Sequence, residues 1–191
     1  HATIFAERAT IAGPNTVRLA SGQEVTAKVI LIAVGAWPSV PNVPGAEFGI
    51  SSNEIFHLES LPKRAVIVGA GYIANEFAGI LQAFGVTVTL VTRGDRMLRG
   101  YDTELVERLV TMSRAKGIDV RFNFPLSGVS KQPDGSLLLE GSGVDAIETD
   151  MLLWAVGRTP KTAGLGLEAV GVELDAQGAI SVNAYNQSSV P

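Results

Sequence analysis

The feature that most constrains the fold is a glycine turn near the middle of the chain. The run Gly69-Ala-Gly71-Tyr-Ile-Ala74 follows four apolar residues, 65–68. Its last three residues begin a stretch, 72–84, with apolar residues at helical spacing. A second stretch with the pattern of a strand, 86–92, comes directly after Gly85. This succession predicts a βαβ unit of about 30 residues. It indicates a parallel sheet with helices packed against it.

The glycine turn also matches the G-x-G-x-x-A pattern of dinucleotide sites. Gly69 allows a tight turn, Gly71 lets the backbone approach a pyrophosphate, and Ala74 lets the helix pack close to the strand. A glycine pair by itself could serve only the tight turn. The helix and second strand at the required distances favour a dinucleotide site. A side chain at Gly71 should block the phosphates.

The residue that ends the second strand indicates which dinucleotide binds. An acidic side chain there would bind the ribose hydroxyls of NAD and repel a 2′-phosphate, but this position is Thr92. Arg93, Arg96 and Arg99 follow, and their guanidinium groups could grip a phosphate. The pattern therefore favours NADP(H). An ordinary solvated turn is the alternative, and Asp95 could neutralise part of the positive charge.

The flanking segments indicate a second domain. Residues 4–11, 17–19 and 25–34 have the pattern of a small β-meander, and the continuous apolar run 29–34 predicts a buried strand. Prolines at 38, 41 and 44 then end the strand and mark an interdomain crossing. Two segments have similar sequences: Leu31-Ile-Ala-Val-Gly-Ala-Trp-Pro38 and Leu153-Trp-Ala-Val-Gly-Arg-Thr-Pro160. We interpret these two segments as the places where the chain passes from one domain to the other and returns.

The remaining patterns complete the expected fold. Ser51 and Glu54 are spaced as a capping box for a short helix over 51–61. A second helix is expected from its N-cap Asp102 to residue 116, with Gly117 ending it before a strand over 118–122. After Pro125, hairpin signals predict an antiparallel insert that closes the sheet, and 147–154 reads as one strand. The predicted fold class is three-layer α/β, a Rossmann-like βαβ parallel sheet with an antiparallel β-meander insert.

Composition excludes several functions. The absence of cysteine removes disulfide, thiolate and zinc-thiolate chemistry, and we predict no catalytic residue and no metal site in this chain. With 15 basic and 19 acidic residues, no broad basic field exists to bind nucleic acid. No apolar run has the length of a membrane span, and a cytoplasmic location is expected. The start at His1 and the polar run before Pro191 suggest a piece of a longer protein.

The runs 69–79 and 91–102 resemble the pyridine nucleotide-disulfide reductases, the flavoenzyme family that includes glutathione, trypanothione and mercuric reductases and lipoamide dehydrogenase. These two runs are most similar to the glutathione reductase type, since the lipoamide dehydrogenase type would have Glu at the position of Thr92. The resemblance covers nearly the whole chain. It implies an oxidoreductase of redox homeostasis that passes hydride from NADPH through FAD and a redox disulfide to glutathione disulfide, of which this chain is a catalytically incomplete part.

The resemblance also implies a domain organisation. Residues 1–37 would be the edge of the FAD-binding domain, 38–157 the NADP(H)-binding domain, and 158–191 the truncated return segment of the FAD-binding domain. The implied partners are a small-molecule dinucleotide and the rest of a homodimeric flavoenzyme. Another disulfide substrate, or a stand-alone nucleotide-binding module, is the alternative. The missing active-site segments would discriminate between them.

Individual roles follow from the same resemblance. It implies that Ala70, Ile73 and Glu76 line the nicotinamide and pyrophosphate side, that Arg93 and Arg99 clamp the 2′-phosphate, and that Tyr72 gates the nicotinamide pocket. Gly157 would back onto the nicotinamide, and the backbone at Ala2 would touch the FAD adenine. Without the resemblance, Tyr72 could be plain helix packing and Glu76 a first-turn carboxylate favoured by the helix dipole. Gly94 stands where many glutathione reductases have His, which implies a looser phosphate grip.

Overall fold

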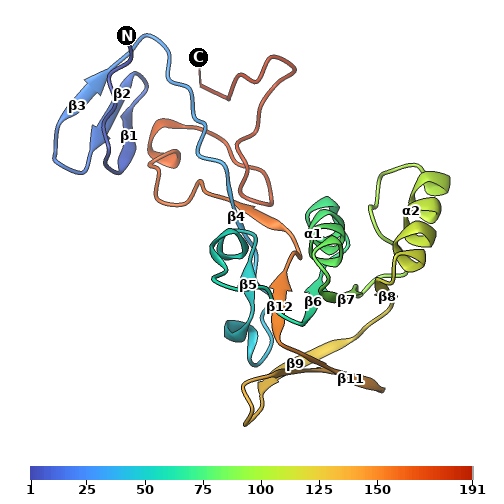
Figure 1. Cartoon of the computed structure of the whole chain (residues 1–191). Coiled ribbons are helices and arrows are strands. Elements are labelled where there is room, and N and C mark those ends of the chain that lie inside the picture. Colours follow the sequence, from blue (N-terminus) through green and yellow to red (C-terminus); the bar gives the residue numbers. More distant parts are fainter. Residues whose placement is uncertain (191) are drawn as a thin grey trace. The chain divides into compact units, whose positions relative to one another are not determined.

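The computed structural model describes residues 1–190, so Pro191, at the end of the expected return segment, lies outside the described residues. The chain divides into two compact units (Figure 1). Unit 1 consists of His1–Trp37 and Thr159–Pro191, and unit 2 is the continuous stretch Pro38–Arg158. The two ends of unit 2 meet, because the Ser39 N–H donates to the carbonyl oxygen of Gly157 at 2.9 Å.

A five-stranded parallel sheet is the centre of unit 2. Its strand order is β5-β12-β6-β7-β8, and every neighbouring pair is parallel. The strands are β5 (Ile50–Ser51), β12 (Met151–Trp154), β6 (Arg64–Val68), β7 (Thr87–Val91) and β8 (Asp119–Arg121). The predicted βαβ unit, β6 to β7 through a helix, is confirmed.

Two helices cover one face of this sheet, α1 (Tyr72–Ala83) and α2 (Thr103–Ala115). Asp102 caps α2 as predicted, since its carboxylate accepts the backbone N–H of Leu105 at 3.1 Å. Gly117 follows α2 with φ of 89°, a left-handed conformation that glycine adopts without steric cost. Alternate strand residues such as Ala65 and Ile67 pack beneath the helices. None of the helices within residues 1–190 is long and apolar enough to cross a membrane.

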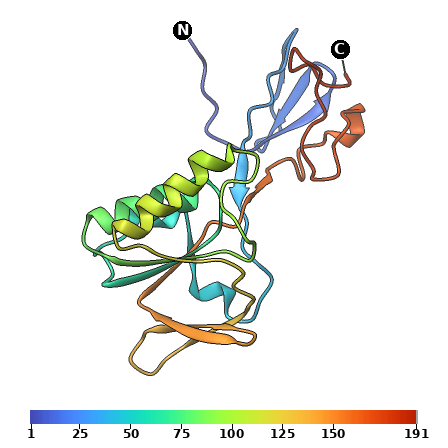
Figure 2. The same cartoon turned by 90° about the vertical axis from the view of Figure 1, so that its right-hand side faces the viewer.

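A separate antiparallel sheet covers the other face. Its strands are β9 (Leu126–Lys131), β10 (Leu137–Gly141) and β11 (Val144–Thr149), in the order β11-β10-β9. Leu139 of this sheet is fully buried in one cluster with Val66 and Trp154 of the parallel sheet. Figure 2 shows the resulting three layers of unit 2, with helices, parallel sheet and antiparallel sheet in succession. The predicted three-layer α/β class is therefore confirmed, although the insert covers the parallel sheet and does not extend it.

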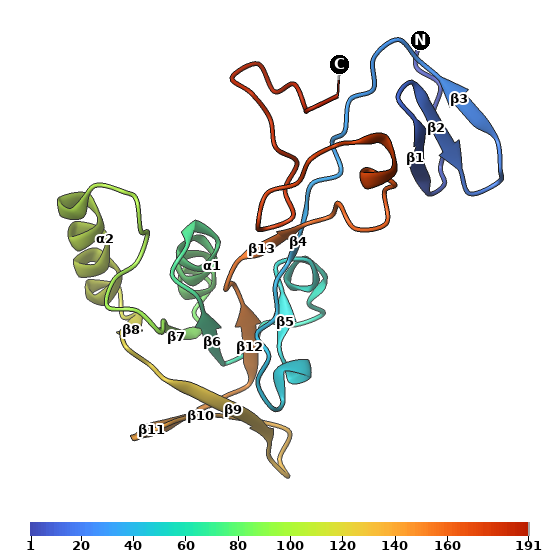
Figure 3. The ribbon, with the colours of Figure 1, turned by 180° about the vertical axis from the view of Figure 1, so that it is seen from behind.

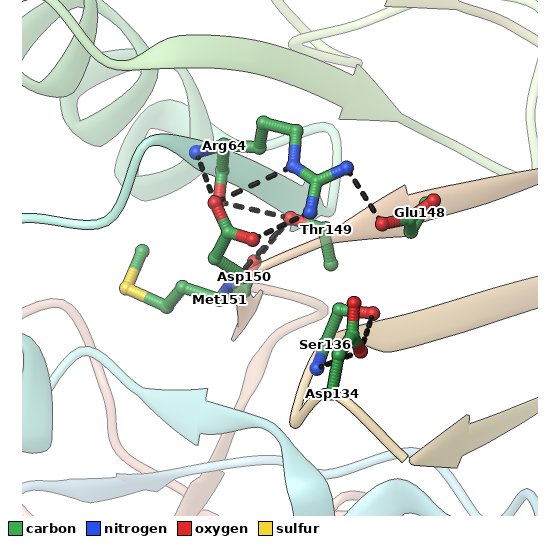
Figure 4. A network of polar contacts seen from close by, with 7 residues as sticks. All are labelled: Arg64, Asp134, Ser136, Glu148, Thr149, Asp150 and Met151. Atoms are coloured by element: carbon green, nitrogen blue, oxygen red, sulfur yellow. Dashed lines mark hydrogen bonds and ion pairs between the residues drawn. The ribbon is translucent and has the colours of Figure 1, made fainter. Parts of the chain in front are cut away.

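The single strand predicted over 147–154 is wrong, because the chain changes sheets at Asp150. The carboxylate of Asp150 accepts the backbone N–H of Arg64 at 2.8 Å and its guanidinium at 2.6 Å (Figure 4). The same guanidinium pairs with Glu148 at 2.8 Å. These bonds hold the pKa of Asp150 below its usual value. The fully buried Thr149 hydroxyl donates to the carbonyl oxygen of Arg64 at 3.0 Å. Together these contacts fix the end of β11 beside the start of β6.

The helix expected over 51–61 is only the 3-10 helix η2 (Glu54–His57), and another, η1 (Ala46–Phe48), lies before it. The predicted interaction of Ser51 with Glu54 does form. The Glu54 carboxylate accepts the Ser51 N–H at 2.7 Å and its hydroxyl at 2.5 Å, which lowers the pKa of Glu54. Sequence spacing thus identified the pair but overestimated the length of the helix.

Unit 1 contains the predicted meander, with strand order β1-β2-β3. The strands are β1 (Ala9–Gly13), β2 (Thr16–Leu19) and β3 (Glu24–Thr26). A small core of Leu165, Leu167 and Val172 forms around the 3-10 helix η3 (Glu168–Val170). Where the chain passes from one unit to the other, β4 (Ala36–Pro38) pairs with β13 (Arg158–Pro160), as Figure 3 shows from behind.

The buried strand predicted over 29–34 is wrong for the described chain. These residues form no strand, and the side chains of Val29 and Leu31 are 83% and 87% exposed. A continuous apolar run is buried as a strand only when neighbouring strands pair with it and other elements cover its faces. Within residues 1–190 no strand pairs with this segment.

Candidate functional site

Unit 2 contains a cleft of about 750 Å³ beyond the carboxyl ends of β6, β7 and β12. Ligands of open α/β sheets bind at this edge, where the chain order of the strands reverses. The cleft is lined by five segments: the glycine turn (residues 68–71), the end of β7 with the following loop (91–94, 96 and 99), and the stretches 39–43, 124–126 and 155–157.

The glycine turn forms the floor of the cleft. Gly69 cannot carry a side chain, because its Cβ would lie 2.2 Å from the carbonyl oxygen of Ala155. Gly71 is different. Apart from its chain neighbours, no described atom lies within 4 Å of the position of its Cβ, and the residue lines the cleft. The fold therefore requires a glycine at 69 but leaves open space above 71.

Helix α1 begins at this open space. Its N-cap is Gly71, and no side chain caps its first turn. The first N–H groups of a helix have no partner within the helix and carry partial positive charge, which favours anions. The amide of Asn75 donates to the carbonyl oxygen of Gly71 at 2.8 Å and fixes that peptide group. The helix end is thus suited to bind a phosphate.

The loop after β7, residues 93–99, is called here the arginine loop. It begins after Thr92, which is buried and accepts the Gly94 N–H on its hydroxyl at 3.3 Å. Arg93, Arg96 and Arg99 all line the cleft. None of these three forms an ion pair with another residue in the range 1–190. Their positive charge is therefore not neutralised inside the protein.

Two apolar residues anchor this loop. Met97 is completely buried in the core beneath the helices. Leu98 adopts φ of 48°, a left-handed conformation that is unfavourable for a residue with a side chain. Its N–H donates to the carbonyl oxygen of Ala70 at 2.8 Å. Asp95, which we expected could reduce the positive charge, is exposed and does not line the cleft.

The structure brings together six of the ten predicted site residues. Those that line the cleft are Gly69, Ala70, Gly71, Arg93, Arg99 and Gly157. Tyr72, Ile73 and Glu76 lie on α1 outside the cleft lining, and Ala2 belongs to unit 1. The alternative interpretation of Glu76 as a first-turn carboxylate is wrong, because the first turn of α1 contains no acidic residue.

Sequence reasoning missed two walls of the cleft. Residues 39–43 were interpreted only as a crossing, and 124–126 only as the start of the insert. Backbone bonds bring the second wall to the arginine loop: the Asn123 N–H donates to Gly94 and the Phe124 N–H to Thr92, each at 2.9 Å. The available signal was position, because 124–126 follow a strand whose carboxyl end reaches the same edge of the sheet.

The described part of the chain, residues 1–190, contains no group of three or more His, Asp or Glu side chains placed to hold a metal ion. The pKa values of Glu54, Asp134 and Asp150 are lowered by hydrogen bonds and that of Arg64 is raised by its carboxylate partners, and none of these four residues lines the cleft. The uncapped first turn of α1 and the three arginines that line the cleft give it the geometry of a binding site for an anionic ligand.

Comparison with known proteins gives consistent matches. Glutathione reductase of Burkholderia cepacia is 46% identical over 188 residues, which are 98% of this chain and 41% of that protein. Trypanothione reductase of Trypanosoma congolense is 40% identical over 172 residues, 88% of this chain and 35% of that protein. The chain thus spans about two fifths of the length of these relatives.

A solved structure extends the similarity to the fold. The HOCl-induced flavoprotein disulfide reductase RclA from Escherichia coli superposes with a TM-score of 0.88 at 27% identity, covering 96% of this chain and 42% of that one. The sequence profile of the pyridine nucleotide-disulphide oxidoreductases matches residues 1–191. The chain belongs to the pyridine nucleotide-disulphide oxidoreductase family.

Proposed function

We propose that unit 2 is the NADP(H)-binding domain of a flavoprotein disulfide reductase that reduces glutathione disulfide. The observation that supports this most directly is that one cleft contains both an open glycine turn and the arginine loop. The residue just before that loop, at the end of β7, is Thr92 and not an acid. The first feature suits a pyrophosphate and the second a 2′-phosphate.

The cleft fits a dinucleotide. The open space above Gly71 would receive the pyrophosphate, and the uncapped first turn of α1 would donate backbone N–H groups to it. Gly157 lines the cleft just after β12, where the family resemblance places the nicotinamide. Bound NADPH would supply a hydride for the flavin of the complete enzyme. The residues of this chain bind and orient the donor.

The preference for NADP(H) over NAD(H) rests on charge. An acid at the end of β7 would accept hydrogen bonds from the ribose and repel a 2′-phosphate, but the Thr92 hydroxyl instead accepts the N–H of Gly94. Arg93 and Arg99 face the cleft without an ion pair within residues 1–190. A guanidinium can donate two parallel hydrogen bonds to one phosphate.

The rest of the proposal concerns the longer protein. Unit 1 would form part of an FAD-binding domain, with the backbone near Ala2 at the FAD adenine. On α1, Tyr72 would gate the nicotinamide pocket, and Ile73 and Glu76 would line the nicotinamide and pyrophosphate side. Because the sequence contains no cysteine, thiol exchange with the disulfide substrate would use residues from outside this chain. We propose a cytoplasmic homodimer as the working enzyme.

Calorimetry with two nucleotide fragments tests the cofactor assignment. The chain should bind 2′-phospho-AMP more tightly than AMP, by about tenfold or more, because the 2′-phosphate adds charge-assisted hydrogen bonds. Replacing Arg93 and Arg99 with Leu should strongly reduce the difference. Equal affinity of the unaltered chain for both ligands would refute the NADP(H) assignment.

Reduction of trypanothione disulfide is a second candidate activity. It is favoured by the 40% identity to the trypanothione reductase of Trypanosoma congolense. Both candidates share the cofactor site, so the nucleotide experiment does not separate them. Steady-state NADPH oxidation by the longer protein with each disulfide does, and the higher kcat/KM identifies the substrate.

A further inference from the structure

Arg96 is the one guanidinium of the arginine loop that the proposed function leaves without a role. It lies between Arg93 and Arg99 in the sequence, and all three line the same cleft. The inference below rests on the proposed function, since it concerns how the 2′-phosphate would be held.

The surroundings of Arg96 leave its charge uncompensated. Its Nε is buried and has no hydrogen-bond partner among residues 1–190. Its Nη2 has only a long contact, 3.4 Å, to the carbonyl oxygen of Tyr101. Removing a charged group from water without a partner is costly, and an anion placed beside it lowers that cost. Arg96 therefore has both the position and the unsatisfied charge of an anion ligand.

Gly94 explains how a third guanidinium can fit. A methyl group at residue 94 would come within 2.7 Å of Nη2 of Arg99, so the Arg99 guanidinium lies against the backbone of Gly94. The backbone of Gly94 is not in a left-handed conformation, so the glycine is not required by the turn itself. The glycine gives room for Arg99 to fold back over the loop toward the cleft that Arg96 also lines.

We infer that Arg96 is a third phosphate ligand and a specificity-determining residue, which with Arg93 and Arg99 surrounds the 2′-phosphate. A phosphate monoester carries close to two negative charges and three terminal oxygens, enough acceptors for three guanidinium groups. The absence of a side chain at Gly94 is then offset by a third charge, so the grip is not looser.

Substitution of Arg96 tests this inference. Calorimetry on the full chain compares the unaltered protein with Arg96→Gln, which keeps a polar side chain and removes the charge. We expect 2′-phospho-AMP to bind about tenfold more weakly, the value of one charge-assisted hydrogen bond, while AMP is unaffected. Arg96→Lys keeps the positive charge but lacks the forked donors of a guanidinium, so it should lose less affinity for 2′-phospho-AMP than Arg96→Gln.

Arg108→Gln is the matched control, since Arg108 is exposed on α2 and does not line the cleft. It should leave both affinities unchanged. Circular dichroism checks folding, and if Arg96→Gln fails to fold, the Lys variant decides: unaltered 2′-phospho-AMP binding by Arg96→Lys would count against the inference.

Three further outcomes separate the inference from the proposed function. If the unaltered chain prefers 2′-phospho-AMP and Arg96→Gln keeps the whole preference, Arg96 is not a ligand but the NADP(H) assignment stands. Equal weakening of both ligands by Arg96→Gln would also overturn the inference. If the unaltered chain shows no preference, the proposed function itself fails.

Discussion

The backbone N–H of Leu98 donates to the carbonyl oxygen of Ala70 at 2.8 Å, and this bond joins the arginine loop to the glycine turn. The two segments that would hold the pyrophosphate and the 2′-phosphate are therefore positioned relative to each other by a backbone bond. Leu98 keeps its unfavourable φ of 48° while its neighbour Met97 is fully buried. The anchoring of the loop thus depends on core packing.

Met97→Ala should destabilise the protein and loosen the arginine loop. Removing a completely buried methionine leaves a cavity and costs about 2–5 kcal/mol of unfolding free energy. At temperatures where the variant stays folded, 2′-phospho-AMP should bind more weakly. Urea unfolding and calorimetry measure the two effects. Met112→Ala is the control, because Met112 is 50% exposed and its loss should change little. A stable Met97→Ala would contradict the anchoring role.

Gly71→Ala should remove nucleotide binding without loss of stability. The added methyl group would meet no protein atom within 4 Å beyond the chain neighbours but would fill the space proposed for the pyrophosphate. We expect an unchanged melting temperature and no measurable AMP binding. Gly79→Ala, in the interior of α1 with equally open surroundings, serves as the control. It should gain about 0.5–1 kcal/mol of stability and keep full binding. Intact binding by Gly71→Ala would refute the location of the site.

Asp150→Asn should reduce stability at neutral pH by about 1 kcal/mol or less, since the pair with Arg64 is partly exposed. The Arg64 guanidinium lowers the pKa of Asp150 in the folded state. The stabilisation that this ion pair gives the folded state is therefore fully present above the pKa of Asp150 in the unfolded state, about 4. It is lost as the pH falls through the lower pKa of Asp150 in the folded state. Denaturant unfolding should show a smaller difference between variant and parent at pH 3 than at pH 7.

The neighbouring Asp145→Asn is the control for this pH effect, because Asp145 is exposed and forms no ion pair within residues 1–190. It should behave like the unaltered chain at both pH values. A destabilisation by Asp150→Asn that persists undiminished at pH 3 would show that the carboxylate charge is not its cause.

The isolated chain should associate through the exposed apolar segment 29–34. Val29 and Leu31 are 83% and 87% exposed, and an extended apolar segment without a paired neighbour is a template for other chains. Replacing both with Lys should shift the sedimentation profile toward the monomer. Gln23→Lys adds a charge elsewhere in unit 1 and should not. Concentration-independent sedimentation of the unaltered chain as a monomer would contradict this expectation.

Local patterns predicted local structure well. The βαβ unit, the Asp102 cap and the interaction of Ser51 with Glu54 depend on residues a few positions apart, so their chemistry is visible in the sequence. The strand over 147–154 was wrong because its break at Asp150 depends on Arg64, a residue 86 positions away. The strand over 29–34 failed because burial depends on neighbouring strands, which no single segment specifies.

The candidate site divides in the same way. The glycine turn and the arginines were identified because each motif lies within one short run of residues. The walls 39–43 and 124–126 enter the cleft only through the tertiary fold, and no local pattern marks them. The burial of Arg96 Nε and the close approach of Arg99 to Gly94 likewise depend on the tertiary fold. The binding roles of all ten predicted site residues stay predictions, both for the six that line the cleft and for Tyr72, Ile73, Glu76 and Ala2.

The hydrogen bond between Ser39 and Gly157 means that unit 2 begins and ends at one joint. All the residues that line the cleft lie in one continuous stretch of the chain, and the two ends of that stretch meet. If unit 2 holds the nucleotide as proposed, a recombination that replaces this stretch would exchange the whole site and leave the order of the strands in unit 1 unchanged. The electron donor could then change without any change in the rest of the chain.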